Sequence, residues 1–136
     1  MTPADKLRAA ATLLRDHLAS AATDGPWHAV QYDAPDDFEA GLGTTPDEPD
    51  IAGHGYEGGG FVRLCDAQYA AAMHPGVGTA LAELFDAAAD LATAYPVLAH
   101  DHYRPACDDY TCDLMCRVAA AARAVLGAGP TNGDTR

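Results

Sequence analysis

The stretch PGVGTALAELFDAAADLATA, residues 75–94, decides the fold class, because its apolar side chains recur at helical spacing. Pro75 suits the first position of a helix, and Pro96 cannot continue one. We therefore expect a helix that opens at Pro75, ends before Pro96 and turns one apolar stripe toward the core. That stripe consists of Val77, Leu81, Leu84, Phe85, Ala88 and Leu91.

Two more main helices and one short helix are expected around this stretch. Thr2 can cap the first helix, which ends at Asp24-Gly25-Pro26. A short helix is expected over residues 66–73, with a break at His74, and a last helix over residues 109–126. The core-facing stripe of the first helix consists of Leu7, Ala10, Ala11, Leu14, Leu18 and Ala21.

Strand patterns occupy the region between the first and second helices. Residues 27–32 alternate well enough for a strand, and Ile51-Ala52 begins a short second one. Residues 61–65 suit a third strand or the first turn of a helix. Residues 33–50 are rich in Pro, Gly and acids, so we expect an exposed loop whose carboxylates are solvated and keep ordinary pKa values.

These elements predict a helix-dominated α+β fold with about three main helices and a small antiparallel sheet of two or three strands. At 136 residues the chain has the usual length of one domain, which we place at residues 1–127. The polar residues 128–136 are expected to be a disordered tail. Much of the 49% apolar content is alanine, which buries little area and predicts a thin core.

The charge balance restricts the partners. Eight Lys and Arg stand against 20 Asp and Glu, a formal charge of −12, whereas a surface that binds nucleic acid or an anionic membrane needs clustered cations. We therefore expect neither partner, and expect another protein instead. Apolar helical stripes on so small a domain are also compatible with a homodimer.

The compartment follows from the N-terminal residues and the cysteines. Residues 1–22 carry acids and no continuous apolar run, so they match neither a signal peptide nor a membrane span, and we expect a cytoplasmic protein. In a reducing compartment the four cysteines are expected to be thiols or metal ligands.

The most specific pattern for chemistry comprises His100, His102, Cys107, Cys112 and Cys116. Zinc takes four nitrogen or sulfur ligands in a tetrahedron, and a loop followed by a helix can fold these groups around one ion. Cys112 and Cys116 lie four apart on the last helix, so both sulfurs emerge on one face. Cys107 and one of the two histidines would close a zinc site from the preceding loop.

Other interpretations of the cysteines stay open. Cys112 and Cys116 also fit a core stripe of small residues, in which a thiol acts as a small hydrophobe. A disulfide that involves Cys107 is the third alternative. Cys65 stands alone in the sequence, and we interpret it as a buried thiol at the end of a strand. His74 is expected to cap the helix that follows it or to pack beside Tyr69.

Two short motifs carry a resemblance to known sequences. Gly25-Pro26-Trp27 and Met73-His74-Pro75, with Ile51-Ala52 between them and Arg-Ala-Val-Leu-Gly at residues 123–127, make the chain similar to short uncharacterised proteins of actinobacteria and their phages. The resemblance extends from Leu7 to Gly127. It implies a lineage and an architecture, and it assigns no catalytic residue.

These observations favour a small acidic binding or interaction protein, encoded by a phage or prophage, with a structural zinc site where the loop meets the last helix. One alternative is a zinc-dependent enzyme that uses the region of His100 and His102. Three protein ligands and a water would favour that enzyme, and four protein ligands would favour the scaffold. Another alternative is an acidic decoy that inhibits a nucleic-acid-binding protein.

Overall fold

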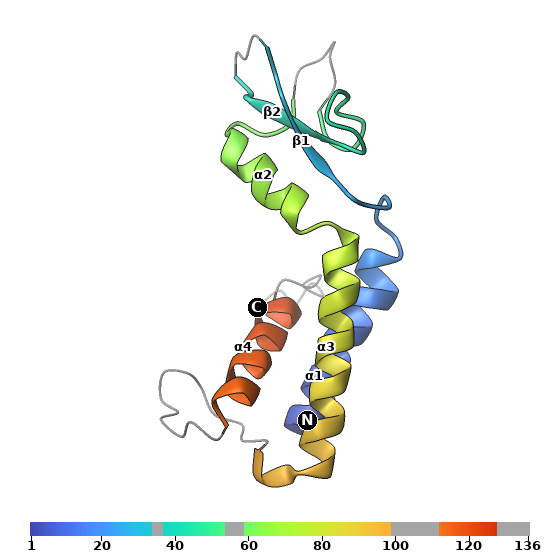
Figure 1. The fold of residues 1–136 in the computed structure, drawn as a ribbon, viewed down its shortest axis with the longest axis vertical. Helices are drawn as coiled ribbons and strands as arrows, with labels where there is room; N and C mark the ends of the chain where they lie inside the picture. Colours follow the sequence, from blue (N-terminus) through green and yellow to red (C-terminus); the bar gives the residue numbers. More distant parts are fainter. Residues whose placement is uncertain (34–36, 54–58, 99–111, 128–136) are drawn as a thin grey trace, which may run out of the picture. The chain divides into compact units, whose positions relative to one another are not determined.

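The computed structural model describes residues 1–33, 37–53, 59–98 and 112–127 (Figure 1). This part of the chain contains four α-helices and a two-stranded antiparallel sheet. The predicted helix-dominated α+β fold is therefore confirmed, and the helix count is slightly higher than the predicted three or so. No described helix combines the length and hydropathy that crossing a bilayer requires. The chain forms two compact units: the helical unit, Met1–Leu18 with Thr79–Arg136, and the strand unit, Ala19–Gly78.

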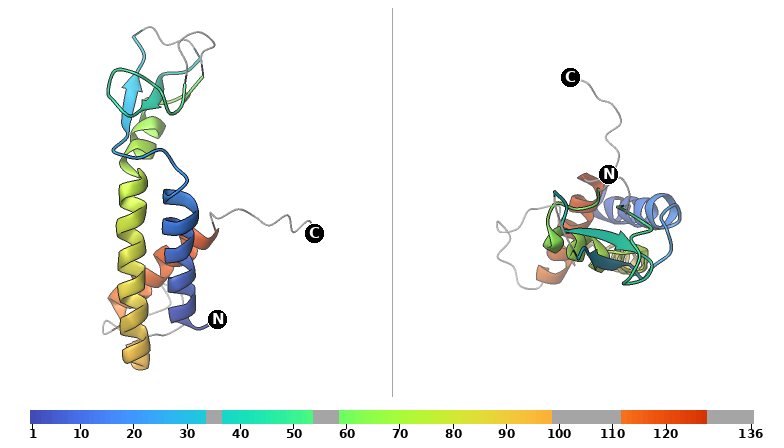
Figure 2. Two further views of the ribbon diagram at one scale, coloured as in Figure 1. Left: turned by 90° about the vertical axis from the view of Figure 1, so that its right-hand side faces the viewer. Right: turned by 90° about the horizontal axis from the view of Figure 1, so that it is seen from above.

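Three helices build the helical unit. α1 (Pro3–Thr12) continues into a π-helical segment, η1 (Leu13–Ala19), and lies alongside α3 (Pro75–Ala94), with α4 (Asp113–Gly127) packed against them (Figure 2). A short 3-10 turn, η2 (Pro96–Leu98), follows α3. The predicted helix start is confirmed, because Thr2 Oγ1 accepts from the Asp5 amide at 3.1 Å while the Asp5 carboxylate accepts from the Thr2 amide at 2.9 Å.

Two ion pairs join the N-terminal helix to α3, one from α1 and one from η1. Arg8 contacts Asp90 at 3.2 Å, and Arg15 contacts Asp86 at 2.8 Å. Hydrogen bonds from Arg15 to Asp86 and to Asp16 raise the pKa of the guanidinium above its ordinary value. All of these side chains are well exposed to solvent, so the pairs set the register of the two helices and add little stability.

The core of the helical unit is built mainly from alanine. Phe85 is its largest fully buried side chain. The cluster consists of Leu7, Ala10, Ala11, Ala82, Phe85, Ala88, Ala89, Ala92, Met115, Val118 and Ala122. Because alanine side chains are short, the three helices approach closely over this face.

The prediction that Leu84 and Leu91 face this core is wrong, since their side chains are 49% and 42% exposed. The buried face of α3 runs through Ala82, Phe85 and Ala89 instead. That series also follows helical spacing, and it turns the two leucines away from α1. Leu18, which we expected in the core stripe of the first helix, is 44% exposed as well.

The strand unit contains the sheet. β1 (His28–Gln31) pairs antiparallel with β2 (Ala40–Gly43), and His28 lies opposite Gly43. β1 confirms the predicted strand, but β2 contradicts the exposed loop expected over residues 33–50, because all four of its residues are buried. The reason is close packing at glycine: a side chain at Gly41 would meet Pro49 and the Tyr32 hydroxyl.

The second and third expected strands are reduced to single bridges. Ala52 pairs with Leu42, and Phe61 pairs with Ala40, each as an isolated contact on β2. α2 (Leu64–Ala72) then begins, and the Glu39 carboxylate accepts from the Leu64 amide at 2.8 Å. That bond satisfies a donor that the helix itself leaves unpaired. α2 packs on β1 and β2.

One acid of the loop after β2 departs from the ordinary pKa expected for it. The Asp50 carboxylate accepts from the Thr44 hydroxyl at 2.7 Å and from the Thr44 amide at 2.8 Å. These bonds, the hydroxyl first, lower the pKa of Asp50 below the ordinary 3.8. The contribution of Asp50 to folding is therefore present above pH 3.8 and is lost as the pH falls through the lower pKa of the folded state.

Thr44→Val should raise the pKa of Asp50 toward its ordinary value, because the variant keeps the amide donor and loses the hydroxyl. The measurement is a pH titration of the Asp50 carboxyl carbon by NMR. Thr45→Val is the matched control and should leave that pKa unchanged. An equal Asp50 pKa in the wild type and in Thr44→Val would contradict the assignment.

Candidate functional site

The structure brings two of the five predicted metal ligands together at the start of α4. The Sγ atoms of Cys112 and Cys116 lie 3.6 Å apart. Each residue is only 1% exposed, and the two form a buried cluster separate from the alanine-rich core. The Cys116 amide donates to the Cys112 carbonyl at 2.8 Å, so the first turn of the helix fixes the spacing of the sulfurs.

The distance between the sulfurs suits a shared metal ion. Zinc bound to thiolates at about 2.3 Å in a tetrahedron holds two sulfurs about 3.8 Å apart. A disulfide bond needs a separation of about 2.05 Å. At 3.6 Å, Cys112 and Cys116 are not joined to each other by a disulfide, and their sulfurs can occupy two corners of one coordination tetrahedron.

The remaining predicted ligands, His100, His102 and Cys107, lie outside the described residues. Within the described ranges, no group of three or more His, Cys, Asp or Glu side chains lies close enough to hold a metal. Asp113, next to Cys112, forms an ion pair with Arg117 at 3.0 Å across one turn of the helix. The Asp113 carboxylate is therefore already paired with an arginine of the same helix.

Cys65 and His74, two other residues singled out in the sequence, both lie in the described part of the chain. Cys65 lies in the first turn of α2 and is exposed, so its interpretation as a buried thiol at a strand end is wrong. Helix α2 begins at Leu64, two residues before the predicted start, so Cys65 lies in the helix and its side chain is exposed to solvent. His74 is confirmed as a cap, because its Nδ1 accepts from the Gly76 amide at 3.1 Å at the start of α3.

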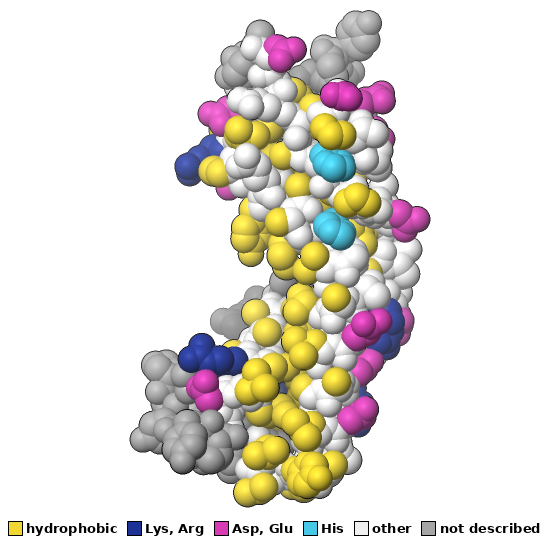
Figure 3. Space-filling view, in the orientation of Figure 1, with side chains coloured by type: hydrophobic (Ala, Val, Ile, Leu, Met, Phe, Trp, Pro, Cys, Tyr) yellow, Lys and Arg dark blue, Asp and Glu magenta, His cyan; other side chains and the backbone are white. Residues whose placement is uncertain are grey.

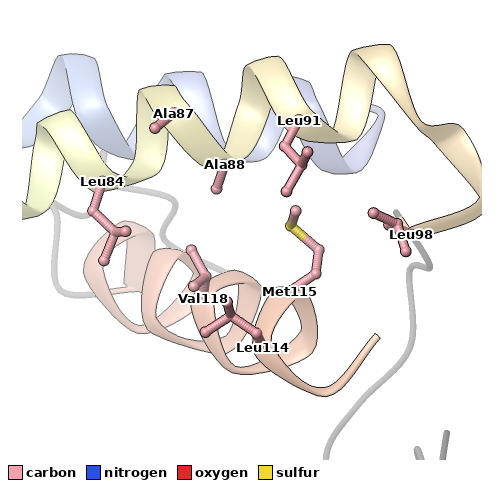
Figure 4. Close-up of a pocket in the computed structure, with 8 residues that line it drawn as sticks. All are labelled: Leu84, Ala87, Ala88, Leu91, Leu98, Leu114, Met115 and Val118. Carbon is pink, nitrogen blue, oxygen red and sulfur yellow. The ribbon is translucent and has the colours of Figure 1, made fainter. Parts of the chain in front are cut away.

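A second feature, which the sequence did not predict, is an apolar groove between α3 and α4. It encloses about 280 Å³, and Figure 4 shows the side chains of the two helices pointing toward each other across it. We call it the leucine groove. It is lined by Leu84, Ala87, Ala88, Leu91, Leu98, Leu114, Met115 and Val118.

The leucine groove lies open on the surface of the helical unit. Leu114 at its rim is 74% exposed. Figure 3 shows apolar side chains gathered over this part of α3 and α4. The sequence contained a signal for the groove. A helix that packs on one core needs apolar side chains on one face only, whereas those of residues 75–94 extend over more than one face.

Comparison of the chain with protein-family models, with curated proteins and with solved structures finds no match. The function must therefore be inferred from the cysteine pair and the leucine groove themselves.

Proposed function

We propose that the chain is a small acidic interaction protein, encoded by a phage or prophage and located in the cytoplasm, in which a structural zinc ion anchors the start of α4. The observation that supports the zinc site is the buried pair Cys112 and Cys116, with sulfurs 3.6 Å apart. A reducing compartment favours this state, because it keeps thiols available for metal. The resemblance carried by Gly25-Pro26-Trp27 and Met73-His74-Pro75 supports the phage source.

Cys107 and one of the two histidines complete the proposed ligand set. Cys107 precedes Cys112 by five positions, and His102 precedes it by ten. A chain spans at most roughly 3.3–3.6 Å per residue, so tethers of five and ten positions are long enough for both groups to reach the cysteine pair. Three sulfurs and one imidazole nitrogen form a standard ligand set for structural zinc.

The proposed role of the metal is to add folding free energy where side-chain burial provides little. α4 contributes Met115, Val118 and Ala122 to a core made largely of alanine, and each alanine buries little apolar area. Metal binding supplies folding free energy directly, because the preformed site does not exist in the unfolded chain. Zinc at the first turn of α4 would therefore fix the helix that carries the leucine groove.

Zinc content, measured by elemental analysis of the untagged protein, tests this proposal. We expect one zinc per chain in the wild type, and four reactive thiols after chelation under denaturing conditions, one for each cysteine. Cys116→Ser should lose the metal, because it removes one of the two buried sulfurs. Cys65→Ser is the matched control, and it should keep the metal because Cys65 is exposed on α2.

Three results would contradict the structural zinc site. They are a wild-type protein without zinc, zinc retained by Cys116→Ser, and fewer than four thiols after chelation, which would indicate a disulfide. X-ray absorption of the zinc protein separates the scaffold from the enzyme. Four protein ligands agree with the proposal, whereas three protein ligands and a water would favour a zinc-dependent enzyme that uses the region of His100 and His102.

The distribution of charge favours the acidic decoy as a second candidate function. The strand unit contains one cation, Arg63, and ten acids, so it carries nine of the twelve net negative charges. The acids are Asp24, Asp33, Asp36, Asp37, Glu39, Asp47, Glu48, Asp50, Glu57 and Asp66. Such a surface attracts the basic sites that hold nucleic acid.

Competition with duplex DNA for a basic DNA-binding protein tests the decoy function. We expect the acidic protein to displace the DNA at low salt and to lose this effect as the salt concentration rises, because screening weakens attraction between exposed charges. Displacement should not depend on zinc. Failure to displace DNA at any salt concentration would exclude this candidate and would leave the zinc site unaffected.

A further inference from the structure

The buried cysteine pair at the start of α4 places two thiols where one can react with the other. The Sγ atoms of Cys112 and Cys116 lie 3.6 Å apart, and neither residue is in a disulfide. A cysteine that has been oxidised to a sulfenic acid condenses with a neighbouring thiol to form a disulfide. The pair therefore has the arrangement that this reaction needs.

The backbone of α4 keeps the two sulfurs from bonding to each other in the reduced protein. The Cys116 amide donates to the Cys112 carbonyl at 2.8 Å, and this bond closes the first turn of the helix. On a regular helix the Cβ atoms of residues four apart lie about 5–6 Å from each other, whereas a disulfide needs them about 3.5–4.5 Å apart. A disulfide between Cys112 and Cys116 therefore requires the first turn of α4 to distort.

The turn that must distort also contributes to the core of the helical unit. Met115, one residue before Cys116, is 7% exposed and packs in the alanine-rich core. Its packing opposes the distortion, so the disulfide would form under strain. A strained disulfide is more easily reduced than a relaxed one. Oxidation of the pair would thus be reversed by the thiols of a reducing compartment.

We propose that Cys112 and Cys116 form a peroxide-sensitive dithiol, and that its oxidation to a disulfide releases the zinc proposed there. One sulfur attacks hydrogen peroxide, an S–O bond forms, the O–O bond breaks, and hydroxide leaves. The second sulfur then attacks the resulting sulfenic acid, an S–S bond forms, and the oxygen leaves as water. In total, two thiols and one peroxide give one disulfide and two waters. The sulfurs lose two electrons, and the peroxide oxygens gain them.

The position of the pair selects a small oxidant. Both residues are 1% exposed, so an oxidant reaches them when the first turn of α4 frays, as helix ends do. Hydrogen peroxide is small and uncharged, so it needs only a slight opening. Metal ligation requires thiolates, which the disulfide no longer provides. The release of zinc rests on the zinc site proposed above, whereas formation of the disulfide does not.

Peroxide treatment of the full chain, followed by mapping of disulfides, tests this proposal. Metal-free protein, prepared by chelation, is incubated with hydrogen peroxide, alkylated, and digested with a protease that cleaves before aspartate. Asp108 and Asp113 separate Cys107, Cys112 and Cys116, so the digest places each of these cysteines on its own peptide. We expect the Cys112 peptide to be linked to the Cys116 peptide, with two of the four thiols lost.

Three variants and the zinc-loaded protein complete the experiment. Cys116→Ser should stop the reaction at a sulfenic acid on Cys112, which dimedone traps. Cys65→Ser is the matched control, and it should keep the disulfide because Cys65 is exposed on α2. Cys107→Ser should keep it as well. In the zinc-loaded protein, release of zinc to a chromogenic chelator should rise in step with the disulfide, and dithiothreitol should restore zinc binding.

Two results in the metal-free protein would overturn the proposal. They are the absence of any disulfide, and a disulfide in which Cys107 replaces Cys112 or Cys116. A zinc-loaded protein that forms the disulfide and keeps its metal would overturn it too. A wild-type protein that never binds zinc would refute the structural zinc site, and the metal-free protein would still decide whether the pair is a peroxide-sensitive dithiol.

Discussion

The packing of α4 against α1 and α3 is the contact on which the proposed sites of the helical unit depend. Met115 and Ala122 bury one face of α4 in the alanine-rich core. A second face brings the sulfurs of Cys112 and Cys116 within 3.6 Å, and a third presents Leu114 to the leucine groove. Since all three faces belong to one short helix, a shift of α4 in its packing would alter the cysteine pair and the groove together.

The alanine-rich core explains why α4 benefits from additional anchors. Alanine allows the helices to approach closely, but it contributes little burial, and Phe85 is the largest side chain fully buried in the contact. The side chains of Leu84 and Leu91 on α3 and of Leu114 on α4 remain 42 to 74% exposed. A metal at the first turn of α4 would supply stabilisation that this core does not provide.

The sequence predicted those elements whose signals are local. The cap at Thr2 and the strand at His28–Gln31 follow from side-chain chemistry and alternation, and the spacing of Cys112 and Cys116 placed both sulfurs on one face of a helix. It did not predict β2, because Ala40–Gly43 lacks the branched and aromatic side chains of a typical strand and is buried through glycine packing. The leucine groove was missed for a related reason: alanine occurs all around α3, so periodicity alone could not show which face is buried.

The most direct test of the account is hydrogen exchange at the Cys116 amide, which closes the first turn of α4 on the Cys112 carbonyl at 2.8 Å. We predict slow exchange at this amide in the zinc-loaded protein. After chelation, exchange there should become fast, while the amides of α1 and α3 around Phe85 keep their protection. Equal protection of the Cys116 amide with and without zinc would contradict the claim that a metal anchors α4.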